Sequence, residues 1–471
     1  MSSPPKGIPI SLNEDSAIPS PPHDRPRVSK SPVASLPGPT LVAADSNVFL
    51  GGDSGILFTQ LILNAMNGGA TGILQTQPYS HQSNDRHTPD RLDMFTLPEN
   101  AKDLIRIFFK YHFVLTPIFH ELTIRTAFDA VIECDVTSRD QHRYTLAIMN
   151  MLFAIAIAHR RSPTVPKDAK ARDFYDRAMY LIQPTMLSHW SIEKVQVLLL
   201  GARYLQCSGS PDECWNVLGL AIRIAYGLRL HLVPSDELDY IAKETHKRVW
   251  YVCFGLDKLL SMIYGRPAIT STSTFSTPLP EDLDDECIQK TRILYPSPRK
   301  PSILSFLIHA SKLYRVMESA DRLSCLSKLS WESLGTVIFS LDEEFEEWSQ
   351  NLAPHLKLDG NTKDETEPAL ILALRANMVR ILIHRQSLAL TLRFLSESRK
   401  SNEYRKAESL KNTMFRHSRN ICLQTAMETI HLVGLRHEKT ADAAGPSWFN
   451  LYYCIPLSRI TKSVANCIYS I

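Results

Sequence analysis

Two stretches of this sequence indicate most clearly how the chain folds: WNVLGLAIRIAYGLRLH at residues 215–231 and KRVWYVCFGLDKLLSMIYGRP at residues 247–267. In the first stretch, apolar residues recur three and four positions apart, which is the spacing of an α-helix with one buried face. These residues are Trp215, Leu218, Ala221, Ile222, Ala225 and Leu228. The second stretch has an almost wholly apolar middle around Trp250 and Phe254. It predicts a buried helix that stops at Gly265-Arg266-Pro267, because glycine and proline end helices.

Asp257 lies in the middle of the second predicted helix, among apolar residues. An unpaired buried carboxylate costs several kcal/mol, so this side chain needs a capping group or a charged partner. Arg266, which follows the helix break, is the predicted partner in a buried ion pair. Within the same pair of helices, Trp250 is the predicted core anchor, and Gly219 is the predicted point of close helix approach.

Helical spacing continues on both sides of these segments from about residue 98 onward, and strand-like alternation is nearly absent. We therefore predict an all-α fold, with one large irregular multi-helix domain at 98–471. Ser210-Pro211-Asp212 predicts a helix start, with serine at the N-cap and proline at the first helical position. No repeat of fixed period is visible, which argues against a tetratricopeptide or HEAT array. The predicted helices cover residues 99–112, 119–133, 140–159, 168–187, 190–207, 211–230, 235–264, 301–326, 330–351, 367–393, 402–434 and 446–470.

Two regions lack helical spacing. Residues 1–39 hold ten of the 29 prolines, and such a composition cannot bury enough apolar area to offset its ordering entropy. Together with the polar stretch after it, this region predicts a disordered tail and linker at 1–97, with one short helix near 54–67. Residues 266–300 hold five prolines and an acidic cluster at 281–286, and they predict an ordered loop across the surface.

Charge and cysteine usage exclude several classes of protein. The net charge is +3, from 52 basic and 49 acidic residues, so the whole chain has no electrostatic attraction to nucleic acid or to an anionic membrane. The longest apolar run, at 144–158, is shorter than the roughly 20 residues that span a bilayer. The nine cysteines are scattered, and the closest two are seven positions apart, which favours reduced thiols in an intracellular protein over disulfides or a zinc site.

Short matches to catalytic motifs have simpler explanations. Gly52-Asp53-Ser54-Gly55 is similar to the serine motif of trypsin-like proteases, but it precedes a predicted helix, where Ser54 serves as a cap. His120-Glu121 begins like a zinc-protease motif, yet Ile124 stands where the second histidine is required. No P-loop, dinucleotide fingerprint or nucleophile elbow is present. We predict that the chain is not an enzyme and carries no catalytic, metal-binding or DNA-binding residues.

Two short basic clusters, His159-Arg160-Arg161 and His246-Lys247-Arg248, remain. Cations of this kind favour the carboxyl end of a helix or face water. The alternative is that they act as nuclear-localisation signals.

The opening stretch resembles a known family. Residues 215–231 are similar to the W-x-x-x-G-x-A-x-R-x-A-x-x-L-G-L-H segment of the fungal transcription factor regulatory domain, also called the middle homology region. Residues 247–267 are similar to its R-R-x-W-W, L-D-R, S and G-R-P elements in order and spacing, with lysine at 247 and 258 and tyrosine at 251 as differences. Weaker similarity extends over about 98–455. Separately, residues 49–55 are similar to the short G-x-S element that often lies between the zinc cluster and the regulatory domain. The signature positions, to which we assign structural roles, are Trp215, Gly219, Arg223, Arg248, Trp250, Asp257, Gly265, Arg266 and Pro267.

The resemblance implies a transcription regulator of RNA polymerase II genes in a fungal nucleus. Members of the family usually begin with six spaced cysteines that hold two zinc ions and bind promoter DNA. Residues 1–133 contain no cysteine, so we expect no cofactor in this chain, and zinc only if a cluster lies upstream. The alternative is a cluster-less helical scaffold or co-regulator that binds a protein partner. The resemblance is compatible with three kinds of partner: a small-molecule effector, a co-regulator protein and a second copy of the chain in a homodimer. It implies no membrane partner.

Overall fold

A computed structural model of the chain describes residues 41–42, 49–50, 93–159, 166–208, 210–298, 300–325, 331–358, 366–398 and 410–439. All of them belong to one unit, Pro39–Ile471. Most of the predicted tail at 1–97, the short helix near 54–67 and the final helix at 446–470 lie outside the described residues.

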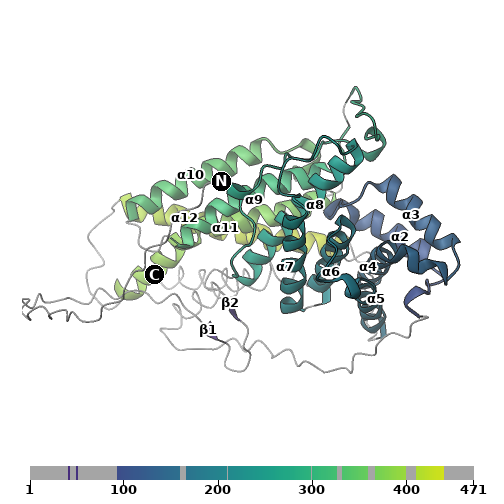
Figure 1. Cartoon of the computed structure of the whole chain (residues 1–471). Coiled ribbons are helices and arrows are strands. Elements are labelled where there is room, and N and C mark those ends of the chain that lie inside the picture. The colour runs from purple at the N-terminus through teal and green to yellow at the C-terminus, as the bar shows by residue number, and fades with distance from the viewer. Residues whose placement is uncertain are drawn as a thin grey trace, which may run out of the picture. The chain divides into compact units, whose positions relative to one another are not determined.

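The predicted all-α fold is confirmed in the part of the chain that the structure describes (Figure 1). Its β-structure there consists of two-residue strands, β1 (Leu41–Val42) and β2 (Phe49–Leu50), which pair antiparallel with Leu41 opposite Leu50, and of a single bridge between Ile288 and Ile293. The α-helices are α2 (Ala101–Tyr111), α3 (Glu121–Glu133), α4 (Arg143–His159), α5 (Pro166–Ile182), α6 (Ile192–Ser208), α7 (Pro211–Gly227), α8 (Tyr240–Tyr264), α9 (Ser305–Cys325), α10 (Trp331–Gln350), α11 (Glu367–Ser398) and α12 (Leu410–Lys439).

The ends of α7 and α8 have local causes. Pro211 occupies the first turn of α7 after Ser210, although the Ser210 side chain makes no capping hydrogen bond. The α8 helix begins five residues later than predicted, because the Asp239 carboxylate accepts a hydrogen bond from Ala242 N at 2.8 Å and caps it there. It ends at Gly265, whose φ of 66° lies in the left-handed region, as the glycine at that position predicts.

Helix α4 is the centre of the first half of the fold. It packs against α2, α3, α5 and α6, and its residues from Leu146 to Ile155 are buried on all sides. A helix that is apolar all round is buried in a protein core or in a membrane. Here it is covered by its neighbours, and no described helix is long and apolar enough to cross a bilayer.

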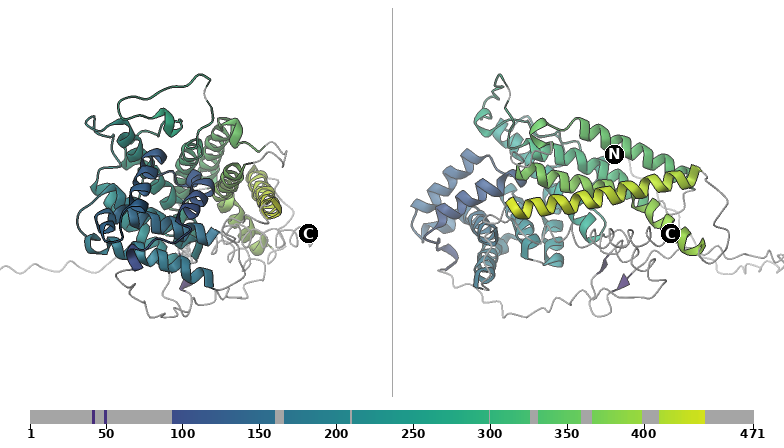
Figure 2. Two further views of the ribbon diagram at one scale, coloured as in Figure 1. Left: turned by 90° about the vertical axis from the view of Figure 1, so that its right-hand side faces the viewer. Right: turned by 180° about the vertical axis from the view of Figure 1, so that it is seen from behind.

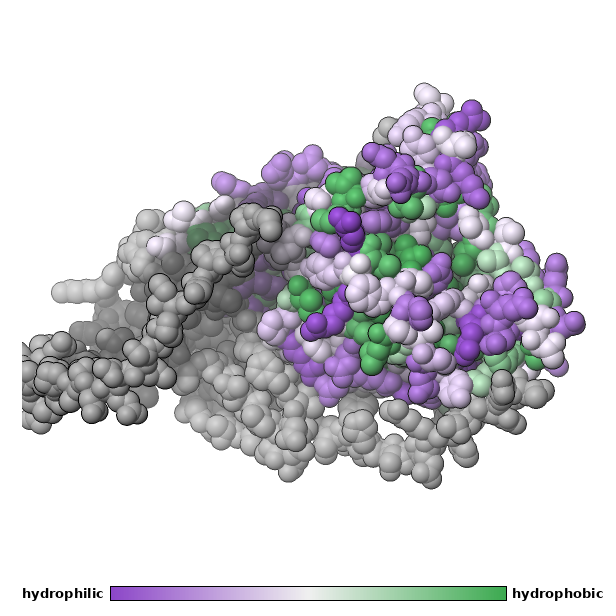
Figure 3. Space-filling view, in the orientation of Figure 1, coloured by the Kyte–Doolittle hydropathy of each residue, from purple (hydrophilic) through white to green (hydrophobic). Residues whose placement is uncertain are grey.

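Helix α8 connects the two halves of the helical core. It packs against α6 and α7 on one side and against α9 on the other, while α9 contacts α10 and α11, and α11 contacts α12 (Figure 2). On the face shown in Figure 3, apolar groups appear in small areas separated by hydrophilic ones, as is usual for a protein surface.

The predicted close approach at Gly219 is wrong. A methyl group there would meet one side-chain atom, Ile269 Cδ1, at an ordinary 3.7 Å. Tighter contacts lie at two other glycines. At Gly227, the last residue of α7, a methyl group would be 2.5 Å from the Trp190 ring, and at Gly255, in the middle of α8, it would be 3.0 Å from the Tyr314 ring on α9. Gly255 therefore sets the spacing between α8 and α9.

The region at 266–298, which the structure describes, has defined structure as predicted, but it does not simply cross the surface. It includes the short 3-10 helices η5 (Thr272–Thr274) and η6 (Asp285–Cys287). Thr277, Leu283, Asp285 and Ile288 are buried, which brings part of the acidic cluster into contact with the helical core.

Candidate functional site

The most extensive buried polar network of the signature region surrounds Arg248 on α8. The Arg248 side chain is fully buried, and its Nη1 donates a hydrogen bond to Phe119 O at 2.8 Å. Its Nη2 lies 2.6 Å from Asp285 Oδ1, in an ion pair whose acid is 8% exposed. The pair joins α8 to the loop after it and to the residues that precede α3.

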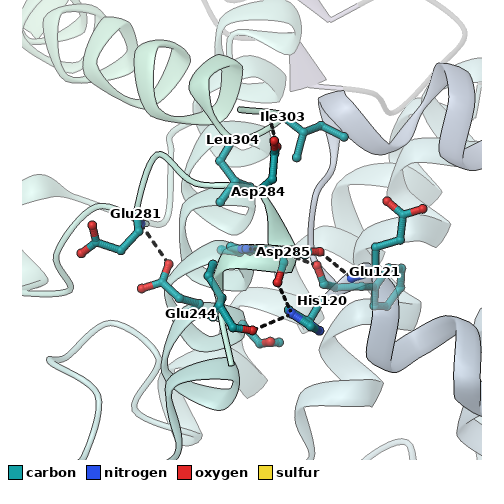
Figure 4. A network of polar contacts seen from close by, with 12 residues as sticks. His120, Glu121, Glu244, Glu281, Asp284, Asp285, Ile303 and Leu304 are labelled. Carbon is teal, nitrogen blue, oxygen red and sulfur yellow. Dashed lines mark hydrogen bonds and ion pairs between the residues drawn. The ribbon is translucent and has the colours of Figure 1, made fainter. Parts of the chain in front are cut away.

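Asp285 and His120 extend this network to the start of α3 (Figure 4). Asp285 Oδ2 accepts a hydrogen bond from Glu121 N at 2.5 Å. His120 Nε2 lies 3.0 Å from Asp285 O and 3.1 Å from Ile288 O, so this nitrogen carries the proton and donates. His120 Nδ1 then accepts from Thr123 Oγ1 at 2.9 Å. Both ring nitrogens have protein partners, which gives His120 a positioning role.

The rest of the acidic cluster is fixed in the same way. Glu244 on α8 is buried, and its carboxylate accepts from Glu281 N at 2.9 Å and pairs with Lys247 Nζ at 2.5 Å. Asp284 Oδ1 accepts from Ile303 N at 3.3 Å, just before α9 (Figure 4). The loop is thus held to α3, α8 and the start of α9 by charge-assisted hydrogen bonds.

The predicted ion pair between Asp257 and Arg266 is wrong. Asp257 Oδ2 accepts from the backbone nitrogen and the hydroxyl of Thr270, both at 2.7 Å. Burial raises the pKa of Asp257, and these two hydrogen bonds oppose the rise. Arg266 pairs with Asp212 at 2.5 Å, and its guanidinium lies over the Trp215 ring at 5.6 Å. The left-handed turn at Gly265 directs Arg266 toward the first turn of α7 rather than back along α8.

A second buried charge cluster lies beside Asp257. Lys258 Nζ donates to Thr270 O at 2.6 Å and lies 3.3 Å from Glu318 on α9. Burial by itself would raise the pKa of Glu318, but hydrogen bonding to Ser271 and the charge of Lys258 lower it below its usual value. Sequence reasoning missed this cluster, although the lysine and aspartate in an apolar helix signalled buried partners.

Of the remaining signature residues, Trp250, the predicted core anchor, lies in the core. It is fully buried, and its ring packs edge-on against Tyr226 and Phe275, with centroids 5.2 and 5.5 Å apart. Arg223 is exposed on α7, and Trp215 is half-buried. The structure thus brings Arg248, Trp250 and Asp257 into the core and leaves Arg223 at the surface.

The basic cluster at 246–248 was predicted to lie at the carboxyl end of a helix or to face water, and neither is the case, since it lies within the first half of α8 (Tyr240–Tyr264). His246 is buried, and its Nε2 lies 3.1 Å from Leu230 O. Arg248 is buried with Asp285, and Lys247 pairs with Glu244. Of the other cluster, Arg160 and Arg161 lie outside the described residues.

The described side chains offer few groups suited to catalysis or metal binding. Within the described ranges, no group of three or more His, Cys, Asp or Glu side chains is placed to hold a metal ion. Burial raises the pKa of Cys214 and of Cys422 to about 12, so both thiols stay protonated and unreactive at neutral pH. The charged network around Arg248 is built to fix the loop and α3, because nearly every group in it has a protein partner.

Comparison with known proteins places these elements in a family. Residues 105–375 match the fungal specific transcription factor domain, which covers α8, its loop and the polar network. Transcription factor FBD3 of Gibberella moniliformis is 27% identical, over 89% of this chain and 60% of the relative. Sorbicillinoid biosynthetic cluster transcription factor 2 of Penicillium rubens is 25% identical, over 65% of this chain and 46% of the relative.

A third relative, Transcriptional activator protein acu-15 of Neurospora crassa, is 23% identical over 83% of this chain and 42% of the relative. The chain therefore spans about 60% or less of the length of these three relatives. The family match covers more than half of the 471 residues and contains the whole signature at 215–267. This chain belongs to the family of the fungal specific transcription factor domain.

Proposed function

We propose that this chain regulates the transcription of RNA polymerase II genes in a fungal nucleus, as the helical regulatory body of a zinc-cluster transcription factor. The observation that carries the proposal is the family match over residues 105–375. The relatives support it, because FBD3 and acu-15 are named as a transcription factor and a transcriptional activator. We assign the regulatory body to 98–471 and the tail to 1–97.

Promoter binding belongs to a separate module in this proposal. Residues 1–133 contain no cysteine, so the spaced thiolates of a zinc cluster are not in this sequence. The module that contacts DNA is then either another part of the same polypeptide or a partner protein. A linked regulatory domain acts by being held at high effective concentration at the promoter.

The buried polar network supports a binding and regulatory role rather than a catalytic one. Arg248, Asp285 and Glu244 bond to protein groups, and they hold the loop at 281–285 and the start of α3 in one arrangement. A catalytic group needs a side chain that is accessible to substrate at a suitable pKa. We therefore propose that the chain is not an enzyme.

The test is a fusion of the whole chain to an unrelated DNA-binding domain, with a reporter gene in a fungal host. We expect reporter output to change and a fluorescent fusion to accumulate in the nucleus. Trp250→Ala should abolish the change, because emptying this fully buried position costs about 3–5 kcal/mol. Phe339→Ala is the matched control, since Phe339 on α10 is 52% exposed.

A fusion that is folded and nuclear, yet leaves the reporter unchanged across varied nutrients, would contradict the proposal. The cluster-less scaffold that binds a protein partner would then be the better hypothesis. A second fusion that carries only residues 98–471 tests the assigned boundary, and it should behave like the whole chain.

A further inference from the structure

Two buried arginines lie outside the polar network around Arg248, and neither has an acidic partner among the residues that the structure describes. Arg203 on α6 is 9% exposed, and Arg375 on α11 is 6% exposed. Arg203 Nη1 donates to Gln206 Oε1 at 2.8 Å, and Arg375 Nη1 donates to Tyr314 Oη at 2.7 Å. Within the described ranges of the chain, no carboxylate forms an ion pair with either guanidinium, in contrast to Arg248.

The Arg375 guanidinium bonds to the hydroxyl of Tyr314 on α9, and the charge of Arg203 also acts on that hydroxyl. Burial raises the pKa of the Tyr314 hydroxyl, and the charges of Arg375 and Arg203 oppose that rise. Burial also lowers the pKa of Arg203, and the charge of Arg375 lowers it further. The two cations therefore influence each other as well as the tyrosine. Their helices belong to one packed series, in which α6 contacts α8, α8 contacts α9 and α9 contacts α11.

Several nitrogen atoms around these arginines are also without acceptors. Arg375 Nε and Gln206 Nε2 are buried and have no hydrogen-bond partner among the described residues. His112 Nε2, on the residue that ends α2, is in the same condition. The pKa of His112 is lowered well below its usual value by burial and then by the charges of His159 and Arg203, so a neutral ring is available to donate through Nε2. The shared feature is an excess of donors.

An excess of buried donors and positive charge requires an acceptor. Buried charges in proteins are paired, because an unpaired one loses its hydration without compensation, and two like charges add mutual repulsion. Guanidinium groups bind carboxylate and phosphate oxygens through two parallel hydrogen bonds. The Arg375 guanidinium also lies over the Phe306 ring, 5.1 Å from its centroid, so the surroundings include an apolar surface.

We propose that Arg203 and Arg375, with Tyr314 and Gln206, form a binding site for a small anion that carries a carboxylate or phosphate group, between α6, α9 and α11. That this site binds an anion is argued only from the burial and the contacts of these four side chains. Its role as the site of an effector rests on the proposed function of the chain as a regulatory body.

The test measures the melting temperature of the purified chain with inorganic phosphate or with succinate, against chloride at the same ionic strength. A site for one of them should give a saturable rise of about 3 °C or more at a hundred times the dissociation constant. The anion that gives the rise distinguishes phosphate from carboxylate recognition. Calorimetric titration should then show one site per chain.

Matched variants separate the site from general effects of salt. Arg203→Met and Arg375→Met should each remove the response. Each deletes an uncompensated charge but also loses one buried hydrogen bond, so neither should lower the melting temperature in chloride by more than about 3 °C. Arg375→Lys keeps the charge but loses the planar fork, so binding should weaken at least about tenfold. Arg223→Met is the control, since Arg223 is exposed on α7, and it should respond like the unchanged chain.

Two results would overturn the binding site. The first is that neither anion raises the melting temperature of the unchanged chain. The second is that Arg375→Met melts more than about 5 °C lower in chloride, because a loss larger than that of one hydrogen bond would show that an acidic side chain of the protein itself is the partner. Binding without any change in reporter output when Arg375→Met is placed in the fusion would overturn only the effector role.

Discussion

The Arg248–Asp285 pair offers the sharpest test of how this fold is held together. Replacing Asp285 by alanine leaves the fully buried Arg248 guanidinium with Phe119 O as its remaining partner, and it leaves the Glu121 backbone nitrogen without its acceptor. Removing one partner of a buried pair costs about 3–5 kcal/mol. We expect Asp285→Ala to lower the free energy of unfolding by about 4 kcal/mol, as measured by urea denaturation followed by circular dichroism.

A double-mutant cycle isolates the interaction. Arg248→Met alone leaves the Asp285 carboxylate without its charged partner, whereas the double variant removes both charges. The double variant should therefore lose at least about 2 kcal/mol less free energy of unfolding than the two single variants lose together. Asp103→Ala is the control, because Asp103 pairs with Arg106 at the surface, where the side chains are 58% and 76% exposed, and it should cost less than about 1 kcal/mol. Additive single costs, or an Asp285→Ala cost near that of the control, would refute the reasoning.

Three further predictions follow from other parts of the structure. Gly255→Ala should lower the free energy of unfolding by about 1–3 kcal/mol, because the new methyl group would press on Tyr314. Gly219→Ala should be neutral or stabilising by up to about 1 kcal/mol. Equal effects of the two variants in urea denaturation would contradict the close approach at Gly255. The hydrogen bond from His384 lowers the pKa of Asp342 in the folded chain. The ionised Asp342 therefore stabilises the fold at pH values above its pKa in the unfolded chain, about 3.9, and this stabilisation is lost as the pH falls through its lower pKa in the folded chain. Asp342→Asn should therefore flatten the acid side of a curve of melting temperature against pH, and an unchanged curve would count against this linkage. The purified chain should hold no stoichiometric zinc and should show no preference for a promoter sequence, because its sequence has no closely spaced cysteine thiolates. Two zinc ions per chain in a metal analysis would refute this prediction.

The helices and the family could be predicted from the sequence because their signals are local. Apolar spacing within one turn predicted the buried face of 215–228, and the glycine at 265 predicted the left-handed end of α8. Trp250 was predicted as core from its apolar neighbours in the chain, and it is fully buried. The linked motifs over 215–267 indicated the family that the comparison over 105–375 shows. Each of these signals lies within a short window of sequence.

The partners of the buried charged side chains could not be predicted from the sequence, because they depend on how distant segments pack together. Asp257 was expected to pair with Arg266, nine positions along the chain, yet it bonds to Thr270, because the turn at Gly265 directs Arg266 elsewhere. Arg248 was recognised as a signature residue, but nothing in the local pattern identified Asp285 as its partner. Periodicity shows that a side chain is buried, but not which distant group packs against it.

The same distinction applies to the proposed anion site. Arg203 and Arg375 lie on helices whose sequences show only helical spacing with an occasional basic residue. Their common neighbour, Tyr314, comes from a third helix, 61 residues before Arg375. An unbalanced pair of buried charges is a property of the assembled core, since it depends on which acidic groups packing leaves outside it. The local pattern of the sequence is enough to predict a helical chain with a regulatory-domain signature. The packing of α6, α8, α9 and α11 determines which buried charges are left without an acidic partner among the described residues.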